Sequence, residues 1–205
     1  GMSQQKKAKT PRFLFAMAAA KATCVALKVA GRAGTHLPGV IAEKVCPGFL
    51  EHLGGTERSI YITGSTGKTS TTNMVNDVLD TLDANQIANR AGSNILPGIE
   101  TALLRQATLG GDYKRPLAAL ELDERWTPYV LPYTNPTVVV VTNLGRDSFH
   151  RNANVEVVYD VLDKNLDCGA RLVLNGDDLI SHHVCPANTN RVYFGIERMP
   201  GEPDE

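Results

Sequence analysis

The chain has 205 residues, of which 42% are hydrophobic and 21% charged, and its formal net charge is -1. This balance is that of an ordinary globular protein with one sizeable core, and the near-zero charge excludes a general binder of nucleic acid. The 4 cysteines form no C-x-x-C pair, which favours reduced thiols in a cytoplasmic protein over a disulfide scaffold or zinc knuckle.

The first 58 residues differ in pattern from the rest of the chain. A short apolar run at 13–20 follows a basic stretch that contains Lys6, Lys7, Lys9 and Arg12. The run is too short to span a bilayer, so residues 12–30 are predicted to form an amphipathic helix. This helix is expected either to pack on the domain or to touch a membrane surface. Residues 31–58 are rich in Gly and Pro without clear periodicity and are predicted to form a linker.

From residue 59 onwards, apolar strand patterns alternate with helical patterns. Strands are predicted at 59–63, 86–89, 117–122, 137–142, 171–175 and 191–195. Helices are predicted at 68–82, at 98–109, and after a cap at Asn154. The first of these helices is expected to use an apolar face of Met74, Val75, Val78, Leu79 and Leu82, and the valine strand at 137–142 to be buried on both faces. This α/β order predicts a mostly parallel sheet flanked by helices on both faces, with ligands at the carboxyl ends of the strands.

One segment between a predicted strand and a predicted helix has the composition of a phosphate loop. It reads Gly64, Ser65, Thr66, Gly67, Lys68, Thr69 and Ser70. The glycines allow a tight turn that points backbone N–H groups at phosphate oxygens, and the helix N-terminus adds a favourable dipole. Lys68 is predicted to neutralise the β- and γ-phosphates, and the Thr69 hydroxyl to bind Mg²⁺. The segment therefore predicts a site for ATP and Mg²⁺, although Ile62 occupies the first glycine position of the common motif.

The shortened loop, T-G-x-x-G-K-[ST]-[ST], resembles the ATP loop of the Mur ligases and folylpolyglutamate synthases, which form amide bonds through an acyl phosphate. Other segments resemble the MurT branch of this superfamily, the synthetase subunits of lipid II isoglutaminyl synthases. They are 89–94 (N-R-A-G-S-N), 121–124 (E-L-D-E), 142–147 (T-N-L-G-R-D), 174–178 (L-N-G-D-D) and 193–195 (Y-F-G). The resemblance runs from about residue 59 to the end of the chain and implies the fold of a P-loop Mur ligase central domain.

Glu121 is the residue that the resemblance assigns to Mg²⁺, with Asp123 as the alternative ligand. It ends a predicted strand about fifty residues after the loop, where a parallel sheet would bring it beside Thr69. Lys68 and Glu121 are the expected catalytic residues.

Three further polar residues are candidates for ligand contacts. Asn94 is expected either to cap a helix or to contact the substrate or the γ-phosphate region. Arg90 is expected either to bind an anionic group of the substrate or to form an exposed ion pair. Asn175 is expected to border the nucleotide, while the neighbouring Asp177 and Asp178 are also suited to the start of a helix.

A second metal site is left open by a departure from the family pattern. Many Mur ligases carry Asp-His-x-Asp in the region of Asp147, and the histidine helps to bind a second metal ion. Here Ser148 replaces that histidine and His150 stands where the second aspartate would be. His150 is expected to be either a substitute metal ligand or a structural histidine.

The resemblance implies an ATP-dependent carbon–nitrogen ligase of bacterial cell wall biosynthesis. In the resembled complex, ATP phosphorylates the α-carboxyl of D-glutamate in the lipid-linked peptidoglycan precursor lipid II. Ammonia from a glutamine amidotransferase subunit (GatD-like) then displaces phosphate and leaves D-isoglutamine. Such a protein is expected in the cytoplasm at the inner face of the membrane. Two alternatives stay open: another ligase of the superfamily, acting on folate or a different carboxylate, and a nucleotide-binding module without chemistry of its own.

The predicted organisation is that of a piece of a larger synthetase. Residues 1–58 form the N-terminal helix and linker, 59–198 the ATP-binding domain, and 199–205 a linker. The resemblance places a zinc ribbon and a C-terminal domain downstream of this linker, so zinc is expected only in that region and ATP and Mg²⁺ in this one.

Overall fold

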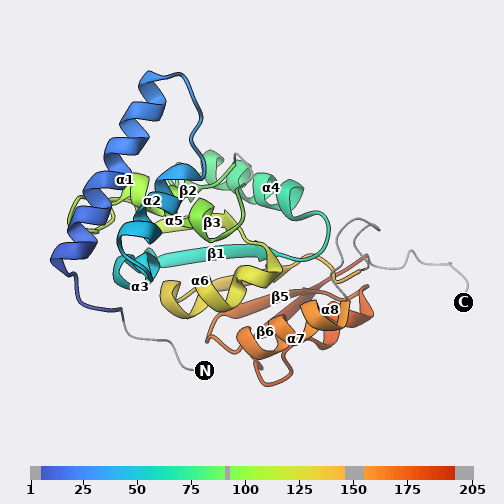
Figure 1. The fold of residues 1–205 in the computed structure, drawn as a ribbon. Coiled ribbons are helices and arrows are strands. Elements are labelled where there is room, and N and C mark those ends of the chain that lie inside the picture. Colours follow the sequence, from blue (N-terminus) through green and yellow to red (C-terminus); the bar gives the residue numbers. More distant parts are fainter. Residues whose placement is uncertain (1–5, 91–92, 146–154, 197–205) are drawn as a thin grey trace, which may run out of the picture.

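The fold is built on one parallel sheet of six strands (Figure 1). The computed structural model describes residues 6–90, 93–145 and 155–196. The strand order is β2-β3-β1-β4-β5-β6, and every neighbouring pair is parallel. The strands are β1 (Arg58–Thr63), β2 (Ile87–Ala88), β3 (Leu117–Glu121), β4 (Val138–Val141), β5 (Arg171–Asn175) and β6 (Arg191–Phe194). The predicted α/β class and parallel sheet are confirmed.

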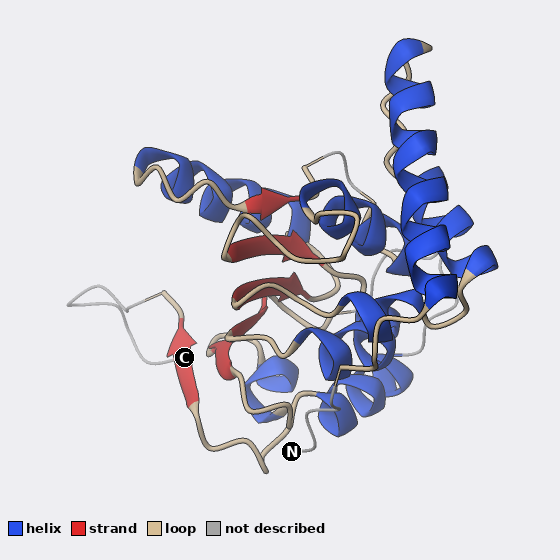
Figure 2. Ribbon diagram, turned by 90° about the vertical axis from the view of Figure 1, so that its left-hand side faces the viewer, coloured by secondary structure: helices blue, strands red, loops and turns tan. Residues whose placement is uncertain are grey.

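Helices cover the two faces of the sheet unequally. They are α1 (Pro11–Val29), α2 (Leu37–Val45), α3 (Phe49–Leu53), α4 (Lys68–Thr81), α5 (Leu96–Gln106), α6 (Thr127–Thr134), α7 (Val155–Asn165) and α8 (Leu179–His183), with a 3₁₀ turn η1 (Glu124–Trp126). Figure 2 shows most of them on one side of the sheet, whereas α4 lies on the other and packs on β1 and β3. Both faces of the sheet therefore carry helices, as predicted, but the face behind β4, β5 and β6 is open in the described part of the chain.

This open face corrects the prediction for the valine strand. Val139 and Val141 are fully buried, but Val138 and Val140 are only half-buried, and Val192 on β6 is 45% exposed. Two fully buried faces require a cover on each side. Among the residues that the structure describes, α4 makes its main sheet contacts with β1 and β3.

The predicted linker at 31–58 is wrong, because it contains α2 and α3 and the start of β1. Gly39 does not loosen α2 but lets it pack closely on α5, since a Cβ atom there would lie 2.0 Å from the carbonyl oxygen of Pro97. Phe49 on α3 stacks on Phe13 of α1 at a ring-centroid distance of 5.2 Å. These helices share one hydrophobic core with the sheet.

The predicted helix at 12–30 is confirmed as α1, but it is not amphipathic, since apolar side chains lie on both its buried and its exposed side. Its first half packs on the domain. Phe13, Ala16, Met17 and Ala20 are buried, while the second half projects beyond the sheet (Figure 1). Among the described helices, none is long and apolar enough to cross a bilayer.

Helix α4 packs on the sheet through polar residues, which corrects the predicted apolar face. Met74, Val78 and Leu82 are 59–70% exposed, whereas Thr72 and Asn76 are buried. The Asn76 amide donates to the carbonyl oxygens of Thr72 and of Ala119 in β3. Hydrogen bonds to the backbone of the sheet thus replace the apolar contact that the periodicity predicted.

The last part of the described chain follows the prediction. Val158 and Leu162 of α7 are buried, and Asp178 caps α8 by accepting from the amide of Ile180. The predicted cap at Asn154 and the predicted linker at 199–205 lie outside the described residues. Helix α6 and the η1 turn had no counterpart in the predicted pattern.

Candidate functional site

The phosphate loop connects β1 to α4 at the carboxyl end of the sheet, where the sequence placed it. Its two glycines are needed for different reasons. Gly64 has φ of +127°, and a Cβ atom there would lie 2.3 Å from the Thr142 hydroxyl. Gly67 has φ of +78° directly before the first residue of α4, in the left-handed region that other residues avoid. Larger residues would therefore disturb the loop at both positions.

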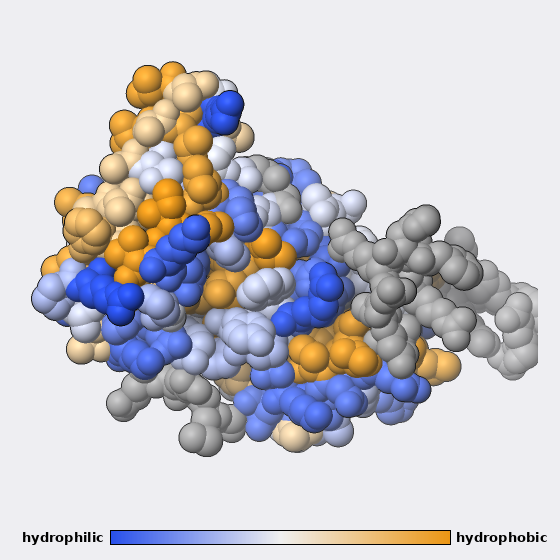
Figure 3. Space-filling view, in the orientation of Figure 1, coloured by the Kyte–Doolittle hydropathy of each residue, from blue (hydrophilic) through white to orange (hydrophobic). Residues whose placement is uncertain are grey.

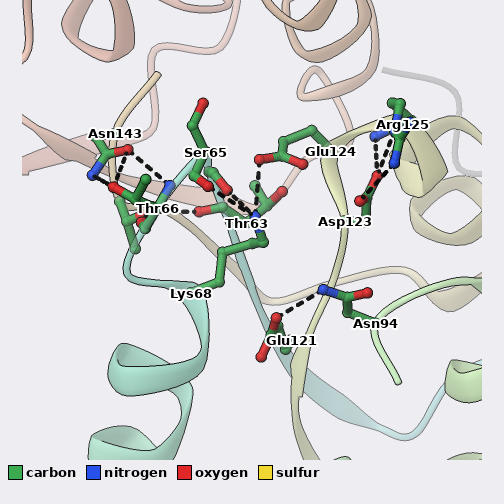
Figure 4. Close-up of polar contacts among 12 residues, drawn as sticks. Thr63, Ser65, Thr66, Lys68, Asn94, Glu121, Asp123, Glu124, Arg125 and Asn143 are labelled. Atoms are coloured by element: carbon green, nitrogen blue, oxygen red, sulfur yellow. Dashed lines mark hydrogen bonds and ion pairs between the residues drawn. The ribbon is translucent and has the colours of Figure 1, made fainter. Parts of the chain in front are cut away.

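The end of β4 braces the loop from the side (Figure 4). The backbone amide of Ser65 donates to the carbonyl oxygen of Asn143 at 2.8 Å. The Asn143 side chain accepts from the Thr66 amide at 3.0 Å and donates to the Thr66 hydroxyl at 2.8 Å. The Thr142 hydroxyl donates to the Thr66 carbonyl at 2.6 Å. The segment at 142–147 contributed to the resemblance, but these bracing roles were not predicted.

Lys68 folds back across the loop. Its ammonium donates to the carbonyl oxygens of Gly64 and Ser65 and forms an ion pair with Glu124 at 3.1 Å. Both side chains are largely buried, with 13% and 9% of their surfaces exposed. Burial raises the pKa of Glu124 above its ordinary value, and the neighbouring Lys68 only partly offsets this. The sequence did not predict this pair, because Glu121 and Asp123 of the same acidic cluster were the expected metal ligands and Glu124 was given no role.

Glu121 lies at the carboxyl end of β3, next to β1, and is only 4% exposed. One carboxylate oxygen accepts from the Asn94 amide at 2.8 Å. The side chain of Asn89 pairs with the backbone N–H and C=O of Glu121 at 2.8 and 2.9 Å. Two asparagines of the segment 89–94 therefore hold Glu121 in place.

Asn94 does not cap α5, so that alternative is wrong. The residue before the helix is Ile95, which makes no side-chain cap bond. The amide of Asn94 is instead directed at the Glu121 carboxylate (Figure 4).

The other acidic and basic candidates have local partners. Asp123 accepts from the Arg125 side chain at 3.1 and 3.2 Å. Burial opposes ionisation of this carboxyl, but the bonds from Arg125 prevail and lower the pKa of Asp123. Arg90 forms exposed ion pairs with Asp77 at 2.7 Å and Asp80 at 2.6 Å. An exposed ion pair was one of the two alternatives predicted for this residue. Its role in substrate binding stays a prediction.

The remaining predicted ligands are placed as follows. Thr69 and Ser70 are exposed in the first turn of α4. The Asn175 amide donates to the Thr142 carbonyl at 3.0 Å, so it supports the strand end that braces the loop. Its contact with nucleotide stays a prediction. His150 lies outside the described residues, and no group of three or more His, Cys, Asp or Glu with metal-binding geometry occurs in the described part.

The geometry supplies the groups that nucleotide chemistry requires. Backbone amides of a tight loop, a lysine and a helix N-terminus converge where phosphates bind in such folds. The Thr69 hydroxyl and Glu121 carboxylate are oxygen donors of the kind that Mg²⁺ prefers. In addition, the Thr63 hydroxyl directly before Gly64 is buried without a hydrogen-bond partner among the described residues. The residues present thus fit a phosphate ligand with Mg²⁺.

Known proteins share this sequence pattern. Residues 62–199 match the family described as Mur ligase middle domain. The MurT subunit of lipid II isoglutaminyl synthase (glutamine-hydrolyzing) from Staphylococcus aureus (strain COL) is 32% identical over 180 residues, which are 87% of this chain and 40% of that protein. The MurT subunit from Streptococcus pneumoniae (strain ATCC BAA-255 / R6) is 28% identical over 82% of this chain and 37% of its own length. The chain thus spans about two fifths of these relatives.

Solved structures share the fold. MurF from Acinetobacter baumannii aligns with a TM-score of 0.57 at 17% identity, over 77% of this chain and 34% of that one. A UDP-N-acetylmuramoyl-L-alanyl-D-glutamate–2,6-diaminopimelate ligase aligns with a TM-score of 0.54 at 15% identity, over 80% and 37% of the two chains. The sequence match, the parallel sheet and the braced phosphate loop agree, and the chain belongs to the Mur ligase family.

Proposed function

We propose that this chain is the ATP-binding part of a ligase subunit that activates a carboxylate of a lipid-linked peptidoglycan precursor for amidation. The observation that carries the proposal is the arrangement at the carboxyl end of the sheet. A braced phosphate loop with Lys68 stands beside Glu121, which two asparagines hold in place. The similarity to MurT subunits of lipid II isoglutaminyl synthase supports this choice of substrate class.

The reaction needs activation because a carboxylate is anionic and has no good leaving group. Transfer of the γ-phosphoryl group of ATP to the carboxylate oxygen of D-glutamate would give ADP and an acyl phosphate. Ammonia would then attack the carbonyl carbon, phosphate would leave, and the nitrogen would lose a proton to give the amide of D-isoglutamine. Bound Mg²⁺ would neutralise phosphate charge, and Thr69 and Glu121 are the residues proposed to hold it. The amides at the N-terminus of α4 and Lys68 would stabilise the charge on the transferring group.

Glu124 has to release Lys68 before the lysine can contact a phosphate. Since its carboxylate pairs with Lys68, a phosphate that approaches the loop has to take over the ammonium from Glu124. Burial of both side chains strengthens the charge interactions that are exchanged. We infer that release of Lys68 from Glu124 accompanies nucleotide binding.

The proposal includes a partner and a place of action. The names of the relatives specify a glutamine-hydrolyzing synthase of which MurT is a subunit. A glutaminase subunit is therefore the proposed source of ammonia, and the inner face of the membrane, where a lipid-linked precursor resides, is the proposed location.

Nucleotide binding by the chain tests the core of the proposal. Lys68→Ala is expected to weaken ATP binding at least tenfold, because it removes the cation of the loop. Lys164→Ala is the matched control, since Lys164 is 75% exposed on α7, and it is expected to bind ATP like the wild type. Titration with a fluorescent ATP analogue measures both. Equal affinity of Lys68→Ala and the wild type would show that the loop does not bind phosphate.

A second measurement tests the chemistry. In the longer protein with its glutaminase, Glu121→Ala is expected to abolish incorporation of ¹⁵N from amide-labelled glutamine into lipid II. Amide formation that depends on ATP would exclude a nucleotide-binding module without chemistry. Amidation of folate in place of lipid II would favour the other ligase class.

A further inference from the structure

Helix α1 carries apolar side chains on two opposite sides, although only one of these sides is covered. The buried side consists of Phe13, Ala16, Met17 and Ala20. The opposite side forms an outward stripe along the full length of the helix. This stripe consists of Leu14, Phe15, Ala18, Ala22, Val25, Ala26 and Val29, all of which are exposed. Phe15, Val25 and Val29 are 68%, 63% and 85% exposed, and Figure 3 shows the apolar surface over this part of the molecule. A helix with apolar side chains on two opposite sides is normally covered on both.

The charge around the stripe indicates what covers it. Residues 6–42 contain seven Lys and Arg and no Asp or Glu, whereas the other residues hold the remaining 14 of 21 basic residues and all 22 acidic ones. Two of the seven form ion pairs, Lys7 with Glu51 and Lys9 with Asp112, and Arg12 donates to the carbonyl oxygen of Val45. Lys21, Lys28 and Arg32 form no ion pair with any residue that the structure describes. The uncovered half of α1 therefore combines apolar side chains with unpaired positive charge.

A basic hollow lies beside the end of the stripe. Its lining includes Val25, Lys28, Arg32 and Arg105, and contains no acidic residue. The guanidinium of Arg105 donates to the carbonyl oxygens of Ala33 and Gly34, which fixes it at the base of the loop after α1. Three cations around an apolar rim match the phosphate of a lipid headgroup above the start of its acyl chains.

We propose that the stripe of α1 docks on the surface of an anionic lipid bilayer, with the helix in the plane of the interface. The aliphatic stems of Lys21 and Lys28 lie along the stripe and let their ammonium groups reach headgroup phosphates. Figure 1 shows the helix at the opposite end of β1 from the phosphate loop, so the loop stays open to nucleotide when the helix is docked. The proposal specifies the surface and the lipid charge for the membrane location proposed above.

Sedimentation with vesicles tests this docking without nucleotide, so its result is independent of the ligase proposal. The wild-type chain is expected to bind vesicles of phosphatidylglycerol and phosphatidylcholine in equal parts, and to bind pure phosphatidylcholine at least tenfold more weakly. Raising the salt from 0.1 to 0.5 M is expected to weaken binding, because exposed charges are screened. Each lysine near an anionic surface contributes about fivefold to binding. The double variant Lys21→Gln with Lys28→Gln is therefore expected to bind at least tenfold more weakly than the wild type.

Matched apolar variants separate the stripe from general stickiness. Phe15→Gln with Val25→Gln and Val29→Gln is expected to abolish vesicle binding while ATP binding persists. Met74→Gln with Val78→Gln and Leu82→Gln removes an equally exposed apolar set from α4, where Asp77, Asp80 and Asp83 lie nearby, and is expected to bind like the wild type. Binding that ignores lipid charge, or equal loss in both triple variants, would overturn the proposal. Concentration-dependent dimerisation that is lost in the α1 variant, without vesicle binding, would assign the stripe to a second copy of the chain.

Discussion

Single residues at the candidate site are held by partners from other segments of the chain. Lys68 is held by Glu124, Thr66 by Asn143, and Glu121 by Asn94. The three partners, Glu124, Asn143 and Asn94, are polar and at least partly buried. Each contact therefore orients a group that is proposed to bind phosphate or metal. Preorganisation of this kind lowers the cost of binding and of reaching the transition state.

The Lys68–Glu124 pair gives a prediction at this scale. Glu124→Gln keeps the shape of the side chain and removes a negative charge next to the proposed phosphate site. We expect ATP without Mg²⁺ to bind roughly fivefold more tightly to this variant, a gain of about 1 kcal/mol from lost repulsion. Titrations with and without Mg²⁺ measure the change in ATP affinity. Asp160→Asn, at an exposed position on α7, is the control. Weaker binding by Glu124→Gln would mean that Glu124 positions Lys68 for phosphate and does not compete with it.

At the scale of elements, close packing of α2 on α5 depends on Gly39. A Cβ atom at this position would lie 2.0 Å from backbone of Pro97, which cannot move like a side chain. Gly39→Ala is therefore expected to destabilise the protein by about 1–3 kcal/mol. The urea midpoint measures the change. Gly110→Ala is the control, because the nearest atom to its Cβ would be a side-chain oxygen at 3.4 Å. A midpoint that is the same in both variants would refute this role for Gly39.

The same elements show what sequence reasoning can reach. Strands β1, β3, β4 and β5 and helix α4 were predicted close to their bounds, because periodicity and the loop motif are local signals. Helix α2 was not predicted, because residues 31–58 are rich in Gly and Pro and lack clear periodicity, whereas the close approach of Gly39 to Pro97 exists only in the folded protein. The prediction of an apolar buried face for α4 was wrong, because the buried Asn76 donates to a carbonyl oxygen of β3. No local sequence pattern reveals that hydrogen bond.

At the scale of the whole molecule, a buried acid links stability to pH. Glu100 on α5 is fully buried, and neither carboxyl oxygen has a hydrogen-bond partner of good geometry among the described residues. Burial first, and then the neighbouring Glu43, raises the pKa of Glu100 well above its usual value. The folded state therefore keeps this proton to higher pH than the unfolded state. The contribution of the neutral acid to stability is complete below the unfolded pKa of about 4.3 and is lost as pH rises through the folded-state pKa.

Glu100→Gln tests this linkage, because glutamine stays neutral at every pH. The free energy of unfolding of the variant is expected to fall less with rising pH than that of the wild type. The difference should approach about 1.4 kcal/mol per pH unit between the two pKa values. Urea unfolding followed from about pH 4 upwards, starting near the unfolded-state pKa, measures it. Glu57→Gln, at an exposed position, should follow the wild-type curve, and parallel curves for Glu100→Gln and the wild type would contradict the prediction.

The candidate site could be predicted only in part from the sequence. The loop from Gly64 to Ser70 and the place of Glu121 followed from a motif and from the geometry of parallel strands. The contacts of Asn89, Glu124 and Asn143 could not be predicted from the sequence. Each contact joins two segments that lie far apart in the chain and come together only in the folded protein.

The brace between Asn143 and the phosphate loop has a consequence for synthesis on the ribosome. Thr66 and its partner are 77 residues apart in the chain. A nascent chain that has exposed the whole loop and α4 still lacks the strand end that fixes the loop. The braced form of the loop can therefore arise only after the segment through Asn143 has left the exit tunnel.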